Sequence, residues 1–175
     1  MTASISAIMN SLAECSLPGP GVTRLPFTDQ HRQANAMITT LMEKAGLDVS
    51  LDDGGTLVGR RHGPDDAPTL LMGSHQDSVR NGGRFDGAMG IILPILALTD
   101  LKDIQLPFAV EVLVFPYAQA VRFPTTLTGS HPIAGSFYLH VPTYHESALE
   151  AAAAPQAYEG MALVTTNTLA PPAPP

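Results

Sequence analysis

The sequence predicts an α/β fold: a three-layer sandwich in which a mixed sheet is flanked by helices. Two segments with helical spacing come first, a glycine-centred hairpin follows, and an apolar strand–helix–strand unit lies in the middle of the chain. Strand–helix–strand order is typical of a sheet with some parallel pairing. These observations together set the fold class.

Two helices are expected before the first strand. Apolar residues at helical spacing predict one over residues 4–13. Thr28 or Asp29 can cap a second helix, which runs to about Ala45. Gly46 stands where a glycine commonly ends a helix.

The sheet is expected from three apolar segments. Residues 47–51 and 56–61 predict a hairpin around two glycines. Residues 69–72 predict a buried strand, and 108–115 form a β-branched, apolar run typical of another. Residues 88–101 are apolar nearly all round, which indicates a helix packed between these strands.

Composition shifts divide the chain into four parts. Residues 1–21 are expected to form an N-terminal helix and linker, and 22–136 the α/β domain. Residues 137–162 form an extension with weaker signals. Residues 163–175 are rich in proline, and such a tail is expected to be disordered or bound to a partner.

The charge and the cysteine content indicate which classes of partner and which cellular compartment to expect. The 175 residues carry a net charge of -7 with only nine Lys and Arg, which argues against nucleic-acid binding. No apolar run is long enough for a membrane span. The single cysteine favours a reducing compartment, and we expect the cytoplasm. A homo- or hetero-oligomer is expected, and a small-molecule ligand is compatible with the composition.

One cluster indicates chemistry. His75 and Asp86 lie on two loops after the strand 69–72, and ligands gather at the carboxyl ends of strands in open α/β sheets. Imidazole and carboxylate are common ligands of zinc, manganese and nickel. Asp77 can accept a hydrogen bond from the second imidazole nitrogen and so orient the ring. The alternative is turn chemistry, with both carboxylates capping loops.

The cluster belongs to a longer pattern that resembles a known family. The order and spacing of five segments are similar to those of N-carbamoyl-L-amino-acid hydrolases and allantoate amidohydrolases, within the zinc-dependent aminoacylases and exopeptidases. The resemblance covers about residues 22–135 and implies a zinc-exopeptidase-like catalytic domain. The segments are 22–25 (VTRL), 42–47 (MEKAGL), 54–60 (GGTLVGR), 73–79 (GSHQDSV) and 82–87 (GGRFDG).

The resemblance implies roles for the clustered residues. His75 matches a metal ligand, Asp86 matches a carboxylate that bridges two ions, and Asp77 matches the residue that orients the histidine. The implied cofactor is zinc, manganese or nickel, as one or two ions that are either weakly bound or absent.

The chain departs from the family where two consecutive glutamates serve as general base and metal ligand. Ala118 takes the base position and Gln119 the ligand position. Alanine accepts no proton, and an amide oxygen is a weak ligand for a dication. The family's lid or dimerisation domain and its later ligands are also expected to be missing. His140 is a further candidate ligand, whereas His31 and His62 are expected to be solvated.

Two functions follow from these departures. The first is a degenerate amidohydrolase homologue that acts as a subunit or scaffold without hydrolytic activity of its own. The alternative is a metal-dependent hydrolase of C–N bonds in small N-carbamoyl, ureido or amide compounds, with a rebuilt or partner-completed site. Whether the chain is itself an enzyme stays open at this level, and a non-enzymatic binder is a third hypothesis.

Overall fold

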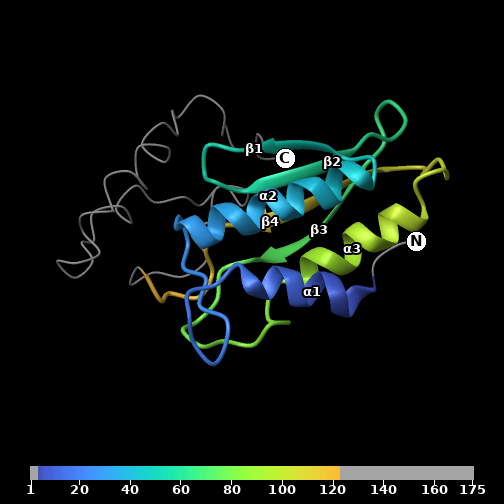
Figure 1. Cartoon of the computed structure of the whole chain (residues 1–175). Coiled ribbons are helices and arrows are strands. Elements are labelled where there is room, and N and C mark those ends of the chain that lie inside the picture. The colour runs from blue at the N-terminus through green and yellow to red at the C-terminus, as the bar shows by residue number, and fades with distance from the viewer. Residues whose placement is uncertain (1–3, 123–175) are drawn as a thin grey trace.

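Four strands form one mixed sheet within residues 4–122, the part of the chain that a computed structural model describes (Figure 1). β2 pairs antiparallel with both β1 and β4, whereas β3 and β4 are parallel. The expected α/β class with a mixed sheet is therefore confirmed. The strands, in their order across the sheet, are β1 (Asp48–Leu51), β2 (Leu57–Arg61), β4 (Ala109–Phe115) and β3 (Thr69–His75).

In the described part of the chain three helices accompany the sheet: α1 (Ile5–Glu14), α2 (Asp29–Lys44) and α3 (Met89–Asp100). The Ser4 and Thr28 side chains accept hydrogen bonds from backbone N–H groups in the first turns of α1 and α2, as N-cap residues do. The expected helices are thus confirmed, with ends that differ by a residue or two.

Gly46 ends α2 as expected. Its φ is 79°, in the left-handed region that glycine enters without steric cost. The chain can therefore turn from the end of α2 into β1.

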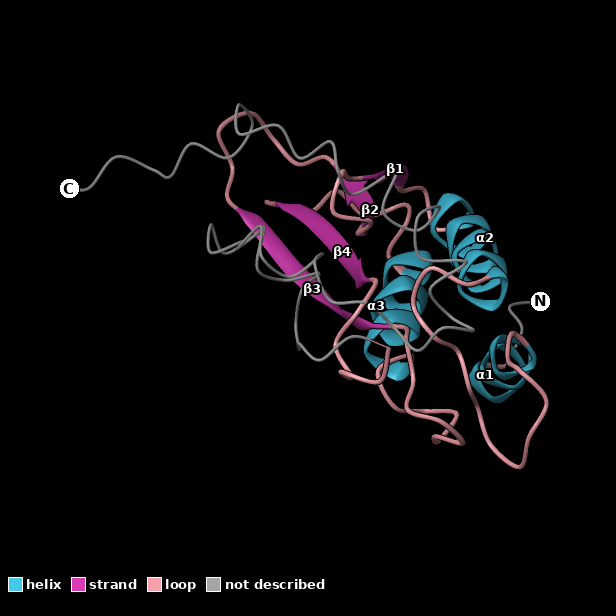
Figure 2. Cartoon of the chain, turned by 90° about the vertical axis from the view of Figure 1, so that its left-hand side faces the viewer, coloured by secondary structure: helices cyan, strands magenta, loops and turns pink. Residues whose placement is uncertain are grey.

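The core lies between the helices and one face of the sheet. Figure 2 shows α1, α2 and α3 on the same side of the strands. Val110, Val112 and Val114 of β4 alternate toward that side and are almost fully buried with Ile91 and Ile95 of α3. Residues 4–122 therefore supply two of the three expected layers, the sheet and one layer of helices.

The expectation for the third strand needs correction. It continues to His75, and it is not buried: Leu70 is 46% exposed and Leu71 is 50% exposed. β3 is the last strand of the sheet, and within the described residues it pairs only with β4. An apolar composition does not decide whether a strand is central or at the edge, and the edge position leaves these leucines uncovered.

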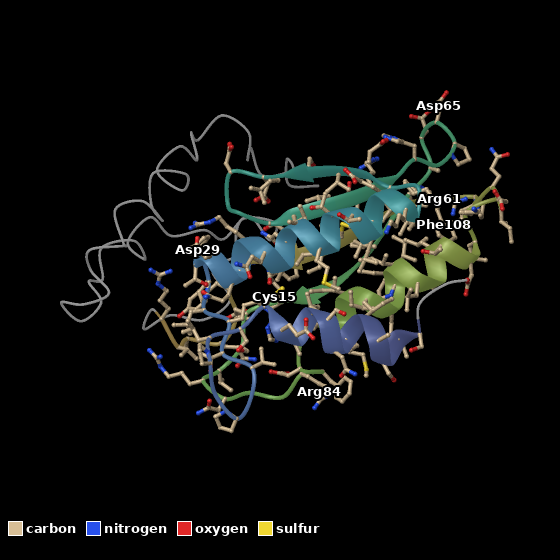
Figure 3. All side chains as sticks on the ribbon, in the orientation of Figure 1. Cys15, Asp29, Arg61, Asp65, Arg84 and Phe108 are labelled. Atoms are coloured by element: carbon tan, nitrogen blue, oxygen red, sulfur yellow. The ribbon has the colours of Figure 1, made fainter. Side chains whose placement is uncertain are left out.

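The parallel pair β3–β4 sets the position of the site. Both strands end at one edge of the sheet, where His75 is the register partner of Phe115. Asp29, at the start of α2, marks the same end of the molecule, while Arg61 and Phe108 lie at the opposite end (Figure 3). Loops that leave β3 and β4 therefore start side by side.

Some predictions concern residues outside 4–122, the part of the chain that the structure describes. No helix within residues 4–122 is long and apolar enough to cross a membrane. The segments 137–162 and 163–175 and the candidate His140 lie outside the described residues. The division of the chain into four parts stays a prediction.

Candidate functional site

His75 is held in one orientation by the residue two positions later. Its Nδ1 lies 2.9 Å from the backbone oxygen of Asp77 and 3.1 Å from the carboxylate Oδ1 of the same residue. Both atoms accept hydrogen bonds, so Nδ1 carries the proton and Nε2 presents a lone pair. The hydrogen bond that His75 donates to the Asp77 carboxylate also raises the pKa of His75, against the opposing effect of partial burial.

Asp77 also joins the two loops of the site. Its carboxylate accepts hydrogen bonds from the backbone N–H of Ala118, at 3.0 and 3.1 Å, and from that of Gln119, at 3.0 Å. The side chain is only 1% exposed. A buried carboxylate with these donors fixes the loop after β4 relative to the loop after β3, a role that the sequence did not reveal.

Gly87 lets the imidazole approach the second loop. Its φ is 65°, and a Cβ there would lie 2.3 Å from the His75 carbonyl oxygen and 2.6 Å from the ring. Only glycine fits both the conformation and the space. The glycine next to Asp86 is therefore a packing requirement of His75.

Three of the predicted site residues come together. The side-chain nitrogen of Gln119 lies 3.3 Å from His75 Nε2 and 2.9 Å from Asp86 Oδ2. Asp86 is exposed and Gln119 is partly exposed, so this group faces solvent. Ala118 is adjacent and offers only a methyl group. The structure thus brings the side chains of His75, Asp86 and Gln119 together, and their role as metal ligands stays a prediction.

Arg24 supports the site from behind, a role that the sequence did not assign. Its guanidinium donates to the backbone oxygens of Gln76 at 2.8 Å, Leu12 at 2.8 Å and Cys15 at 3.0 Å. Its backbone N–H donates to the Ser78 hydroxyl. Burial lowers the pKa of Arg24, and the buried guanidinium is compensated by its hydrogen bonds to these three carbonyls. Arg24 thereby ties the loop after β3 to the end of α1.

The expectation that His31 is solvated is wrong. The residue is 3% exposed, and its Nε2 donates to the Pro116 carbonyl at 3.2 Å. Burial lowers the pKa of His31 to about 4. A signal was present: His31 is three positions before Ala34, so it shares the apolar face of α2. His62 is exposed, as expected, and its ring contacts Asp48.

These residues form two sides around His75. We call Arg24, Gln76 and Asp77 the support side, because they are buried and hold the loops. We call Asp86, Ala118 and Gln119 the ligand side, because they face the point where a ligand of His75 Nε2 would lie.

The donor set on the ligand side fits one weakly held ion. His75 Nε2 and the Asp86 carboxylate are good ligands, whereas Gln119 would have to turn its amide oxygen inward. No group of three His, Cys, Asp or Glu that could hold a metal occurs among the residues the structure describes. The described residues therefore do not make the two-ion centre that the resemblance implies.

Comparisons with known proteins agree with the resemblance. A scan against family models finds no match. The chain is 38% identical to an N-carbamoyl-L-amino acid amidohydrolase of Geobacillus stearothermophilus over 122 residues. The matched residues cover 68% of this chain and 30% of the relative. It is 37% identical to the allantoate amidohydrolase of Bacillus subtilis, over 67% of this chain and 29% of the relative.

Solved structures extend the likeness to the fold. A hydantoinase/carbamoylase family amidase from Burkholderia ambifaria matches with a TM-score of 0.75 and 29% identity, over 90% of this chain and 40% of that one. A zinc-dependent exopeptidase-like structure from Bacteroides vulgatus, at 17% identity and a TM-score of 0.57, shares the fold alone. The chain is therefore homologous to these amidohydrolases, and it spans about a third of the length of the curated relatives it matches.

Proposed function

From its homology to N-carbamoyl-L-amino-acid and allantoate amidohydrolases, we propose that this chain forms part of a metal-dependent amidohydrolase. Its substrates would be small N-carbamoyl, ureido or amide compounds, cleaved at a C–N bond. The observation that supports this is the convergence of His75, Asp86 and Gln119 beside an imidazole whose tautomer is fixed by Asp77. The single cysteine is consistent with the cytoplasm as the compartment.

The described residues offer two side chains that could bind a metal ion. His75 would bind through Nε2 and Asp86 through its carboxylate, a set suited to zinc, manganese or nickel. A bound divalent ion would supply Lewis acidity to the substrate carbonyl and to a water molecule. Asp77 keeps the proton on Nδ1 of His75, so the other nitrogen remains a ligand.

The described residues place no carboxylate at the position that the resemblance assigns to the general base. Ala118 has no group that takes a proton, and a general base contributes roughly 10²–10⁴-fold in rate. We propose that a carboxylate from another segment or from a partner subunit completes the site. A homo- or hetero-oligomer would supply such a group.

A second candidate is a subunit or scaffold without hydrolytic activity of its own. Ala118 and Gln119 favour it, because both positions have lost the carboxylate that the resemblance implies. The names of the relatives favour the hydrolase, which is therefore the first candidate.

The two candidates differ in an assay of the full chain with N-carbamoyl-L-amino acids and allantoate. We expect hydrolysis that needs added zinc or manganese and that is lost with EDTA or with His75→Ala. In a chain to which no other segment or partner supplies the base, Ala118→Glu should raise the rate by about 10²–10⁴-fold, because it returns a carboxylate to the base position. Gln105→Ala, at an exposed glutamine between α3 and β4, is the matched control and should change nothing. Absence of turnover in both the native chain and Ala118→Glu, with metal bound, would replace the hydrolase by the scaffold.

A further inference from the structure

We propose that the Gln119 side chain takes the position of the metal ion, bridging His75 and Asp86 with its amide until an ion displaces it. Gln119 would then be a competitor of the metal that sets its affinity. This inference deepens the proposed function, on whose metal site it rests, but it does not depend on turnover.

The donors and acceptors match this arrangement. An amide nitrogen carries two N–H groups, and Gln119 Nε2 faces two acceptors, His75 Nε2 at 3.3 Å and Asp86 Oδ2 at 2.9 Å. The reverse orientation of the amide would set its oxygen against a carboxylate oxygen and an imidazole lone pair. The chemistry of the neighbours therefore selects the orientation with nitrogen inward.

A single carboxylate holds both parts of this bridge. Asp77 accepts a hydrogen bond from the backbone N–H of Gln119 and also fixes the proton of His75 on Nδ1. The bridging residue and the lone pair that it contacts are thus positioned by the same group. The amide does not have to search for its partners, because its backbone is already fixed beside them.

The bridge and an ion need the same two atoms. A dication bound between His75 and Asp86 would meet the positive end of the amide, so the side chain must turn away or turn its oxygen inward. The free energy of the two hydrogen bonds is then lost on binding. A net value of about one ordinary hydrogen bond corresponds to roughly fivefold in affinity.

The sign of one substitution separates a competitor from a ligand. In a titration of metal-free protein with zinc against a chelating dye, Gln119→Ala should bind zinc about fivefold more tightly than the native chain, because the competitor is removed. Gln119→Glu should bind more tightly still, because a carboxylate replaces the amide. Gln105→Ala is the control with unchanged affinity. Weaker or equal binding by Gln119→Ala would overturn the proposal.

A second readout needs no metal. In EDTA, the ¹⁵N resonance of His75 Nε2 should shift in Gln119→Ala, because its hydrogen-bond donor is gone, and should stay in place in Gln105→Ala. An unchanged resonance in Gln119→Ala would also overturn the proposal. Neither readout depends on hydrolysis, so failure of the proposed enzyme activity leaves both measurements interpretable.

Discussion

The support side and the ligand side of the site differ in burial and in chemistry. Arg24, Gln76 and Asp77 are at most 3% exposed, whereas Asp86 is exposed and Ala118 and Gln119 are partly exposed. The support side has the bonds needed to orient a metal-binding histidine. The ligand side keeps the Asp86 carboxylate but lacks the two carboxylates that the resemblance implies at positions 118 and 119. A site can therefore keep its scaffold while its reactive positions change.

The difference has a physical reason. A substitution on the support side leaves buried polar groups without partners, which costs free energy of folding. A substitution on the ligand side leaves groups in contact with water and costs little. Substitutions on the two sides should therefore differ in how far they lower the free energy of unfolding.

Asp77→Ala should have the largest effect on stability. It removes the acceptor of the Ala118 and Gln119 N–H groups and of the His75 side chain. We expect the free energy of unfolding to fall by about 2–5 kcal/mol in urea titrations. If the loss were no larger than that of Asp86→Ala measured in parallel, the two sides would not differ.

Arg24→Met should have the second largest effect on stability. The methionine fills similar space but leaves the carbonyls of Leu12, Cys15 and Gln76 without the guanidinium. We expect a loss of about 2–3 kcal/mol in the free energy of unfolding. Arg32→Met is the control, because Arg32 is 68% exposed and its ion pair with Asp29 is worth little. Equal losses in both variants would count against a structural role for Arg24.

The pH dependence of stability should show the lowered pKa of the buried His31 side chain. Its pKa of about 4 lies below the unfolded value, so its contribution is full above about pH 6.5 and is lost as pH falls toward 4. Between pH 7 and pH 4.5 the native chain should lose about 2 kcal/mol more than His31→Gln, which keeps a donor for Pro116 but does not titrate. Parallel pH profiles of the two proteins would show that His31 is not buried in its neutral form.

Asp86→Asn should have the smallest effect. The side chain is exposed, and its hydrogen bond from Gln119 can be kept by the amide oxygen. We expect a change within about 0.5 kcal/mol in the free energy of unfolding. A larger loss would mean that the ligand side also supports the fold.

The sequence predicted most elements because local signals decide them. The caps at Ser4 and Thr28, the stop at Gly46 and the β-branched run of β4 act within a few residues. The prediction that β3 is buried was wrong, because the position of a strand in a sheet depends on its partners. Those partners lie far away in the chain.

The parts of the site that depend only on spacing along the chain could be predicted from the sequence. His75 and Asp77 are two positions apart, so their contact follows from one loop. The bonds from Asp77 to Ala118 and Gln119 join residues about forty positions apart through the parallel pairing of β3 and β4. Arg24 was missed for the same reason, since its partners come from other elements. The burial of His31 could have been inferred from the apolar face of α2, but its partner Pro116 could not.

The support side holds His75 and Asp86 in the positions that a metal ion would need. The most direct test is a crystal structure of Gln119→Glu grown with zinc, with anomalous data collected at the zinc edge. We expect a single peak in contact with His75 Nε2 and Asp86. A well-ordered structure with no peak there, or with zinc bound only elsewhere, would contradict it.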